Sequence, residues 1–437
     1  MSYQAIAATV RITPHPKADR LEIAVVANHR VVVGKGDYQN GDLVLFFPEG
    51  GQLSHAVCHE NNLYREGKGI NKNPEIVGYI SDRRRIRSMK LRGIESNGLV
   101  LGFQAFAFTG ADLGAIKEGQ LVNELNGQQI CCKYVTPATQ RAISKAKRAA
   151  LKRPKDPSMF KQHYQTPKLR YSIDRIPDGA RITITRKLHG TSGRTGYCRV
   201  GTERALPFWQ SVLNRLGASY TPKVDYAYKY ISGSRRVTFH NIEDTSDSYR
   251  ITAHQLIEGK LKKGETAYYE ILHTDPTGTA LFTHAIPEAK DKASKAMRKR
   301  YGSTMNYTYG VLDTDIYLYR MTMTNEDGVS MDYSPSQLAR RANEMAIQVV
   351  PFVGEYTHIN GQIINTLTGE ADILSDKCAR LSQGASALDS RHITEGIVVR
   401  VEHPDMEQVF KYKGFDFCTL EGIRKNSDTY VDPEEAA

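Results

Sequence analysis

One stretch of this 437-residue chain divides it in two and constrains the fold more than any other feature. Residues 141–155 are rich in Ala, Lys and Arg, contain no acidic residue, and include Pro154, with Pro157 just beyond. Because Ala, Lys and Arg favour helices and proline ends them, this stretch predicts a short basic helix. We therefore expect two domains, residues 1–138 and 161–437, joined by a basic linker helix at residues 139–160.

The first domain is predicted to consist of short strands. Residues 25–33 and 43–47 are β-branched or apolar runs followed by glycine-containing turns, and residues 99–101 form a third apolar run. Short strands separated by Gly and Pro predict a small β-barrel.

A basic segment lies between these expected strands. Residues 82–92 include Arg84, Arg85 and Arg87, and the whole chain has a formal net charge of +11 and a pI near 9.2. A positive surface on a small barrel favours binding to an acidic polymer. We expect the three arginines to contact nucleic-acid phosphates; a solvated basic loop is the alternative.

Cysteine spacing and hydropathy exclude several classes of protein. None of the six cysteines forms a Cys-x-x-Cys pair, so a zinc ribbon or a disulfide framework is not expected. The sequence shows no signal peptide and no transmembrane run. We expect an intracellular protein, cytoplasmic or nucleoplasmic, that does not bind membranes and is a monomer.

The second domain mixes strands and helices. Alternating residues predict strands at residues 181–186 and 267–272, and a final strand pair at residues 396–401 and 408–413. Helices are expected at residues 287–299, 336–347 (capped by Ser334 or Ser336) and 371–381. The expected fold class is α+β, with antiparallel sheets and flanking helices after the barrel.

Five short segments of this domain carry residue types suited to nucleotide chemistry. A Lys-x-x-Gly alone is weak evidence, and the order of the five segments is more informative. They are Lys187-Leu188-His189-Gly190-Thr191-Ser192, Ser232-Gly233-Ser234-Arg235-Arg236, Tyr268-Tyr269-Glu270-Ile271, Glu395-Gly396-Ile397-Val398-Val399-Arg400 and Phe410-Lys411-Tyr412-Lys413.

A lysine can attack the α-phosphate of a nucleotide only as the free amine. Its usual pKa is about 10.4, so a neutral amine at pH 7 costs roughly 4 to 5 kcal/mol unless the site supplies the shift. A metal ion near Glu395, together with Lys411 and Lys413, would favour the neutral amine and stabilise charge on the phosphates. Glycine after the lysine lets the backbone approach the nucleotide.

In order and type, the five segments resemble the nucleotidyl-transfer motifs of the covalent nucleotidyltransferases, which comprise DNA ligases, RNA ligases and capping enzymes. The resemblance extends over residues 181–417. The Lys187-x-His189-Gly190 sequence resembles the branch of phage T4 RNA ligase 2, where His replaces the Asp of Lys-x-Asp-Gly.

The resemblance implies a role for each site residue. Lys187 would be the nucleophile that ATP adenylylates, with His189 and Gly190 beside the nucleotide. An aromatic residue, Tyr309 or its alternative Tyr307, would stack on the base. The remaining roles are implied as follows: Arg235 contacts the sugar or the 5′-phosphate, Glu270 holds the ribose, Glu395 together with Glu270 places Mg²⁺ or Mn²⁺, and Lys411 and Lys413 bind phosphate.

The first domain has a resemblance of its own. His15-Pro16-Lys17-Ala18-Asp19-Arg20-Leu21-Glu22 and Arg92-Gly93-Ile94-Glu95-Ser96-Asn97-Gly98-Leu99 resemble OB-fold tRNA-binding modules. An OB domain before the transferase domain resembles the Naegleria-type RNA ligases. DNA ligases and capping enzymes carry theirs after the last motif, and about two dozen residues after Lys413 are too few for a barrel.

The two resemblances together imply an ATP-dependent RNA ligase that seals 5′-phosphate and 3′-hydroxyl ends through a lysyl-AMP on Lys187. Its partner would be RNA, including a nicked duplex or an RNA/DNA hybrid. Three alternatives stay open: an ATP-dependent DNA ligase, a GTP-dependent mRNA capping guanylyltransferase, and an RNA-end-binding protein on an inactive ligase scaffold.

Overall fold

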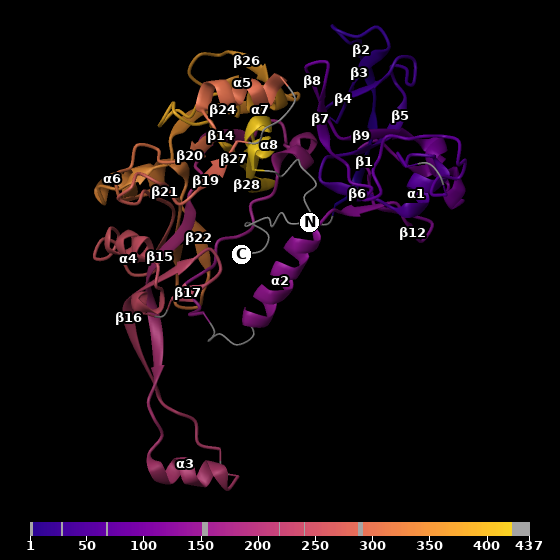
Figure 1. Cartoon of the computed structure of the whole chain (residues 1–437). Coiled ribbons are helices and arrows are strands. Elements are labelled where there is room, and N and C mark those ends of the chain that lie inside the picture. Colours follow the sequence, from indigo (N-terminus) through magenta and orange to yellow (C-terminus); the bar gives the residue numbers. More distant parts are fainter. Residues whose placement is uncertain are drawn as a thin grey trace.

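The structure is a computed structural model that describes residues 3–27, 29–66, 69–150, 156–217, 219–239, 241–286 and 292–421. The described residues up to 133 form one β-rich body, and those from 156 onward form a second, larger α/β body (Figure 1). The expected fold class, an OB-type barrel followed by antiparallel sheets with flanking helices, is confirmed.

The barrel is built from short antiparallel strands around two apolar clusters, with Leu45 and Phe47 in one and Val44 and Phe46 in the other. Its main sheet has the order β10-β1-β5-β9, a second has the order β2-β3-β4, and three strand pairs complete it. The elements are β1 (Ala5–Thr9), β2 (Arg11–Pro14), β3 (Leu21–Val26), β4 (His29–Gly34), β5 (Leu43–Phe47), β6 (Gly51–Leu53), α1 (His55–Glu60), β7 (Ser88–Leu91), β8 (Ile94–Asn97), β9 (Leu99–Gly102), the 3₁₀ helices η1 (Phe103–Thr109) and η2 (Leu113–Ala115), β10 (Leu121–Val122), β11 (Glu124–Leu125), β12 (Gln128–Gln129) and β13 (Cys131–Lys133).

One expected barrel strand is wrong. Residues 25–33 do not form a single strand, because the chain turns at Ala27, whose φ is 45°. The Val-rich run pairs with itself as the hairpin β3–β4, with Val26 opposite His29. A run of β-branched residues satisfies either arrangement, so the turn was not visible in the pattern. The expected strands at residues 43–47 and 99–101 are confirmed as β5 and β9.

The structure has a helix, α2 (Pro137–Ala150), in the region between the two bodies. Thr136 precedes it and its hydroxyl accepts a hydrogen bond from the backbone N–H of Thr139 at 3.1 Å, as a helix N-cap does. Pro154 lies outside the described residues. Met159 and Phe160 pack with Cys198 and Ile231 of the second body, so its packing begins before residue 161.

The second body contains two antiparallel sheets and a short strand pair. One sheet has six strands in the order β26-β25-β24-β14-β27-β28. The other has the order β17-β16-β15-β18-β21-β22, with β23 paired in parallel to β21. The strands are β14 (Arg181–Lys187), β15 (Thr191–Glu203), β16 (Val224–Ser234), β17 (Thr238–Phe239), β18 (Glu265–His273), β19 (Thr283–Ala285), β20 (Thr304–Asn306), β21 (Thr314–Thr324), β22 (Ser330–Asp332), β23 (Gln348–Val349), β24 (Phe352–Ile359), β25 (Gln362–Asn365), β26 (Ala371–Ile373), β27 (Gly396–His403) and β28 (Met406–Lys413).

Helices flank these sheets, and one lies far from them. The β15–β16 pair extends beyond its sheet and carries α3 (Phe208–Arg215) at its tip (Figure 1). The other helices are η3 (Leu169–Tyr171), η4 (Ile173–Arg175), η5 (Ile242–Asp244), α4 (Ser248–Gln255), α5 (Lys292–Tyr301), α6 (Pro335–Glu344), α7 (Leu374–Leu381) and α8 (Phe415–Leu420).

The three helices expected in the second domain compare with the structure as follows. The cap at Ser334 is confirmed: its side chain accepts from the backbone of Gln337, whose own side chain caps Ser334 in return. The helix expected at residues 371–381 begins only at Leu374, because the first three residues pair with β25 as strand β26. Residues 287–291 of the third expected helix lie outside the described residues, and the rest is α5.

Ion pairs between described residues join the barrel to the second body. Arg170 of η3 is buried and its guanidinium lies 2.6 Å from the Glu49 carboxylate of the barrel. Arg30 of β4 lies 2.9 Å from Asp376 of α7, and this pair is largely exposed. Across the described residues, no helix is both long enough and apolar enough to span a bilayer.

Candidate active site

Strand register brings two distant lysines to one place. Lys187, the last residue of β14, pairs with Gly396, the first residue of β27. Gly396 pairs in turn with Lys413, the last residue of β28. A Cβ at Gly396 would collide with the carbonyl oxygen of Tyr412, so only glycine fits at this crossing point. The residue before it, Glu395, therefore lies between the two lysines.

Glu395 is the centre of this arrangement. Its side chain is 1% exposed, and one carboxylate oxygen, Oε1, lies 2.9 Å from the Nζ of Lys187 and 3.1 Å from the Nζ of Lys413. Lys411 lies two residues before Lys413 on β28, and both line the same cavity. The charges come from three neighbouring strands, so a buried carboxylate is compensated by cations that the sheet itself positions.

Two hydrogen bonds to its backbone stabilise the turn between β14 and β15. The backbone N–H of His189 donates to the Tyr309 hydroxyl at 2.9 Å, and that of Gly190 donates to Oε1 of Glu270 at 2.9 Å. A Cβ on Gly190 would collide with the carbonyl oxygen of Ile271. The glycine is thus required by the approach of β18, whereas the sequence suggested close approach to a nucleotide.

A cavity of about 590 Å³ lies next to these residues and is lined by strands from both sheets. Its volume lies within the range of small-molecule sites. The expected site residues that line it are Lys187, His189, Gly190, Arg235, Glu270, Glu395, Lys411 and Lys413. Arg235 also donates to the backbone carbonyl of Tyr164 at 3.3 Å.

Tyr309 is the exception among the residues expected to contact a nucleotide. It is not among the described residues that line the cavity, because it is buried behind the turn with φ of 52°. Its alternative, Tyr307, packs edge-on against the His189 ring and is also absent from the described lining. The aromatic residues that do line the cavity include Tyr319 of β21, together with Tyr164, Phe282, Tyr333 and Phe352.

Sequence reasoning missed several cavity residues. Tyr319 shares a 2.7 Å hydrogen bond with Ser192, and burial raises its pKa. Arg250 of α4 donates to the Thr191 hydroxyl at 3.1 Å and to the Ser192 carbonyl at 3.2 Å. Burial and nearby Arg320 lower the pKa of His163, which keeps that ring neutral. These residues lie outside the five segments, and only the folded chain brings them together.

The two residues expected to place a metal, Glu270 and Glu395, have different partners in the structure. Glu270 supports Gly190, and Glu395 pairs with the lysines. Among the described residues, one group of His, Cys, Asp or Glu brings three ligand atoms within 4.8 Å of one another, and it consists of His189, His284 and Glu421. Neither expected metal residue belongs to it.

The three barrel arginines lie on a half-buried segment. The backbone of Arg85 bridges to Gln52 of β6, and the Arg85 guanidinium lies 4.9 Å from the Tyr134 ring centre. Burial lowers the pKa of Arg87, and repulsion by Arg85 and other nearby arginines lowers it further. Arg84 has a φ of 54°. The structure thus concentrates positive charge here but does not bring it into the cavity lining.

Comparisons with known proteins bear on the fold. A family model described as an OB-fold domain matches residues 3–103. No curated protein matches the chain. Solved structures similar in fold include Naegleria gruberi RNA ligase in a lysine-to-alanine variant with ATP and Mn (15% identity, 95% of this chain and 98% of that chain, TM-score 0.51). The same ligase with pyrophosphate gives 16% identity, 95% and 97% coverage and a TM-score of 0.50.

The chain shares the fold of this RNA ligase. The likeness extends over both bodies, since it covers 95% of the chain. At 15% identity this likeness shows the architecture alone, including the order in which the barrel precedes the larger α/β body.

Proposed function

We propose that this protein is an ATP-dependent RNA ligase that works through a lysyl-AMP on Lys187. The observation that carries the proposal is the Lys187–Glu395–Lys413 arrangement, which stands beside a cavity of about 590 Å³ in a fold shared with an RNA ligase. The Naegleria gruberi structures hold ATP and Mn or pyrophosphate, which fits a cation-lined cavity of this size.

The reaction has three steps. The Lys187 amine attacks the α-phosphorus of ATP, a P–N bond forms and pyrophosphate leaves. An oxygen of the RNA 5′-phosphate then attacks the adenylate phosphorus and releases the lysine. Finally the 3′-hydroxyl of the other RNA end attacks the activated 5′-phosphate, a phosphodiester forms and AMP leaves.

Glu395 controls the first step. At 2.9 Å from the Lys187 Nζ, its carboxylate stabilises the ammonium form, which is not a nucleophile. The Lys187 amine can lose its proton and become reactive when the Glu395 carboxylate pairs with another cation instead. Lys413 already contacts the same carboxylate oxygen. A divalent ion, Mg²⁺ or Mn²⁺, fits here because a buried carboxylate beside a phosphate-sized cavity offers a hard oxygen ligand, and it would neutralise charge on the phosphates.

Other cavity residues have roles in binding. Lys411, Lys413 and Arg235 would contact phosphates, since all three line the cavity. Glu270 would accept a hydrogen bond from a ribose hydroxyl while supporting Gly190. Tyr319 would contact the base in the place first assigned to Tyr309, and Tyr309 would instead hold the His189 backbone.

The barrel would hold the RNA. Arg84, Arg85 and Arg87 lie in one half-buried segment in which Arg85 repels Arg87, and a phosphate chain would relieve that repulsion. We further propose residues 1–138, 139–160 and 161–437 as barrel, linker helix and transferase domain. RNA over DNA is proposed from the resemblance of Lys187-x-His189-Gly190 to phage T4 RNA ligase 2 and from the barrel-first order.

Covalent labelling tests the proposal. The full-length protein is incubated with each α-labelled nucleoside triphosphate and Mn²⁺ or Mg²⁺, denatured and separated on a gel. Label from ATP that is acid-labile and stable to denaturation is expected. Equal labelling from GTP would favour the capping reaction. No labelling from any nucleotide would favour an RNA-end-binding protein on an inactive scaffold.

Strand chemistry decides between RNA and DNA ligase. Nicked duplexes are compared in which the strand supplying the 3′-hydroxyl ends in ribonucleotides or in deoxyribonucleotides. Sealing should be faster with the ribonucleotide end, because a protein distinguishes RNA through the 2′-hydroxyl. Equal rates would assign the protein to the DNA ligases.

A further inference from the structure

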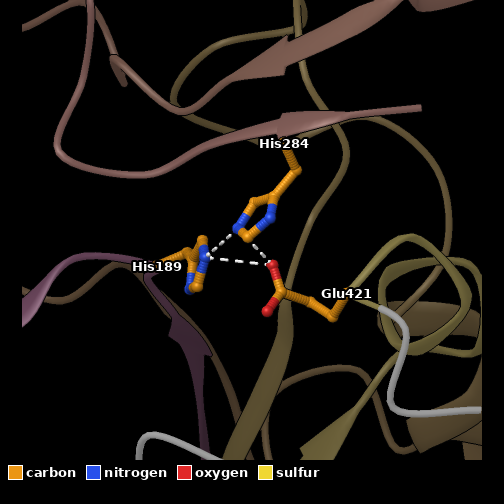
Figure 2. Close-up of side chains that lie close together, drawn as sticks. All are labelled: His189, His284 and Glu421. Atoms are coloured by element: carbon orange, nitrogen blue, oxygen red, sulfur yellow. Dashed lines mark hydrogen bonds and ion pairs between the residues drawn. The ribbon is translucent and has the colours of Figure 1, made fainter. Parts of the chain in front are cut away.

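Three side chains from distant parts of the chain meet at the turn that follows Lys187. His189 comes from that turn, His284 from β19, and Glu421 follows α8. Figure 2 shows their polar atoms pointing toward one common point. The Nε2 atoms of the two imidazoles lie 3.3 Å apart, and Oε1 of Glu421 lies 3.3 Å from His189 Nε2 and 2.6 Å from His284 Nε2.

These spacings fit a tetrahedral metal site. Zinc binds imidazole nitrogen and carboxylate oxygen at about 2.0–2.2 Å, so neighbouring ligand atoms of a tetrahedron lie roughly 3.3 Å apart. Two of the three spacings equal that value. The third, between His284 and Glu421, is a hydrogen bond and would lengthen when a metal replaces the shared proton.

The surroundings fix the His189 ring for this role. Phe282, Tyr307 and Phe417 have ring centres 4.5, 4.8 and 5.0 Å from it. Its other nitrogen, Nδ1, lies 3.8 Å from Oε2 of Glu395. A histidine ligand usually turns its second nitrogen toward a carboxylate, which sets the tautomer and orients the ring. Glu395 thus stands where such a supporting carboxylate belongs.

Burial adds to the case. The side chains of His189 and Glu421 are 10% and 7% exposed, and that of His284 is 29% exposed. The cluster brings together one carboxylate oxygen and two imidazole nitrogens, all within 4.8 Å of one another.

We propose that His189, His284 and Glu421 bind one zinc-class divalent ion, separate from the Mg²⁺ or Mn²⁺ that the ATP reaction uses. Two imidazole nitrogens favour zinc over magnesium, which takes oxygen ligands. The three described ligands leave the fourth position to water or to a further ligand. The bound ion would join the turn after Lys187, β19 and the segment after α8, and would position His189 beside Glu395.

The experiment uses the full-length protein without nucleotide, so its outcome is independent of the proposed ligase reaction. Metal is removed with a chelator, and Zn²⁺ is then titrated in competition with a chromogenic chelator. One tightly bound Zn²⁺ per chain is expected, with no competition from millimolar Mg²⁺. Binding should also raise the melting temperature, because the ion binds the folded chain.

Cobalt identifies the ligands. Co²⁺ should give the intense visible bands of a tetrahedral site, without the near-ultraviolet thiolate band that a cysteine site would add. His284→Asn and Glu421→Gln should each weaken Zn²⁺ binding at least about 100-fold and abolish the visible bands. His403→Asn is the matched control, since His403 lies on β27 and belongs to no such cluster among the described residues.

Several outcomes would overturn the proposal. Among them are no saturable Zn²⁺ binding by the wild-type protein, or His284→Asn and Glu421→Gln variants that bind as tightly as the wild type; the cluster would then be a closed hydrogen-bond network. If a variant fails to fold by circular dichroism, Glu421→Asp provides the second measurement: it should retain Co²⁺ binding with a shifted visible spectrum. An unchanged spectrum would exclude Glu421 as a ligand.

Discussion

The cavity of the second body and the basic segment of the barrel both concentrate positive charge, but in different ways. In the cavity, Lys187 and Lys413 come from separate strands and share one buried carboxylate, Glu395. In the barrel, the arginines are neighbours in one segment, and burial together with repulsion by Arg85 and other nearby arginines lowers the pKa of Arg87. The first arrangement fixes distances, and the second concentrates charge.

Under the proposed function, this difference assigns bond formation to the cavity and RNA binding to the barrel. A bond-forming step needs reacting atoms held at defined distances, which strand register provides for Lys187, Glu395 and Lys413. Holding an RNA chain needs positive charge over several phosphates and tolerates looser geometry. We therefore expect changes in the cavity to abolish adenylylation, and changes in the barrel to weaken RNA binding and sealing alone.

The largest effect is expected at Lys187. Lys187→Ala removes the amine that would form the P–N bond, so labelling from α-labelled ATP should disappear completely. Lys377→Ala is the control, because Lys377 lies on α7 and does not line the cavity. Labelling of Lys187→Ala at the wild-type level would place the nucleophile elsewhere.

Glu395→Ala should lower the rate of adenylylation more than tenfold at neutral pH, or over 1.4 kcal/mol, because the divalent cation proposed to activate Lys187 would lose its ligand. Raising the pH should restore part of the rate, since the amine then loses its proton to solvent. Glu355→Gln is the matched control, a carboxylate change in the same cavity. If Glu395→Ala labels normally at neutral pH, Glu395 has a structural role only.

The five segments could be predicted because each lies on a regular strand or at its end. Once β14, β27 and β28 are neighbours, the register itself brings Lys187 and Lys413 to Glu395. The barrel could be predicted as a class from its short strands, whereas the β3–β4 turn could not, because a continuous Val-rich run fits one strand as well as two.

Other parts of the site could not be predicted because nothing local marks them. Tyr309 precedes β21 and Tyr319 lies on it, so the sequence does not distinguish which tyrosine lines the cavity. Only the backbone turn at Tyr309 places its hydroxyl against the backbone of His189. His284 and Glu421 come from segments with no motif, and meet only through the packing of β19 and α8. A single sequence does not indicate that two distant residues are in contact when that contact depends on tertiary packing.

The next largest effect is expected from changes to the basic segment of the barrel. Arg84→Glu, Arg85→Glu and Arg87→Glu together should weaken RNA binding and flatten its salt dependence by roughly 0.7 per lost phosphate contact on a single strand. Adenylylation should stay unchanged. Arg20→Glu, on the same barrel and exposed, is the control for net charge. Because the segment is half-buried, Arg87→Gln is the milder variant, and it should show the same trend in binding.

Measurement of RNA binding by fluorescence anisotropy at several salt concentrations, beside the labelling assay, separates the two regions. Loss of labelling in the charge-reversal variant would show that the barrel segment also supports the cavity. Unchanged RNA binding would mean that the basic segment serves another partner.

The smallest effect is expected where the two regions touch. Arg30 and Asp376 lie 2.9 Å apart, but the Arg30 side chain is 53% exposed, so the pair contributes at most about 1 kcal/mol to docking of the barrel. Arg30→Ala should therefore slow sealing by no more than about fivefold and leave adenylylation unchanged. Asp376 also lies in the first turn of α7, so its removal would disturb the helix as well.

An exchange of the two charges avoids that complication in part. Arg30→Asp should lower sealing further than Arg30→Ala, because it places two carboxylates side by side. Combining it with Asp376→Arg should restore sealing, and the coupling measured across the four proteins gives the contribution of the pair itself. If the exchange also changes adenylylation, the orientation of the barrel reaches the cavity, and the division between holding RNA and forming bonds would be incomplete.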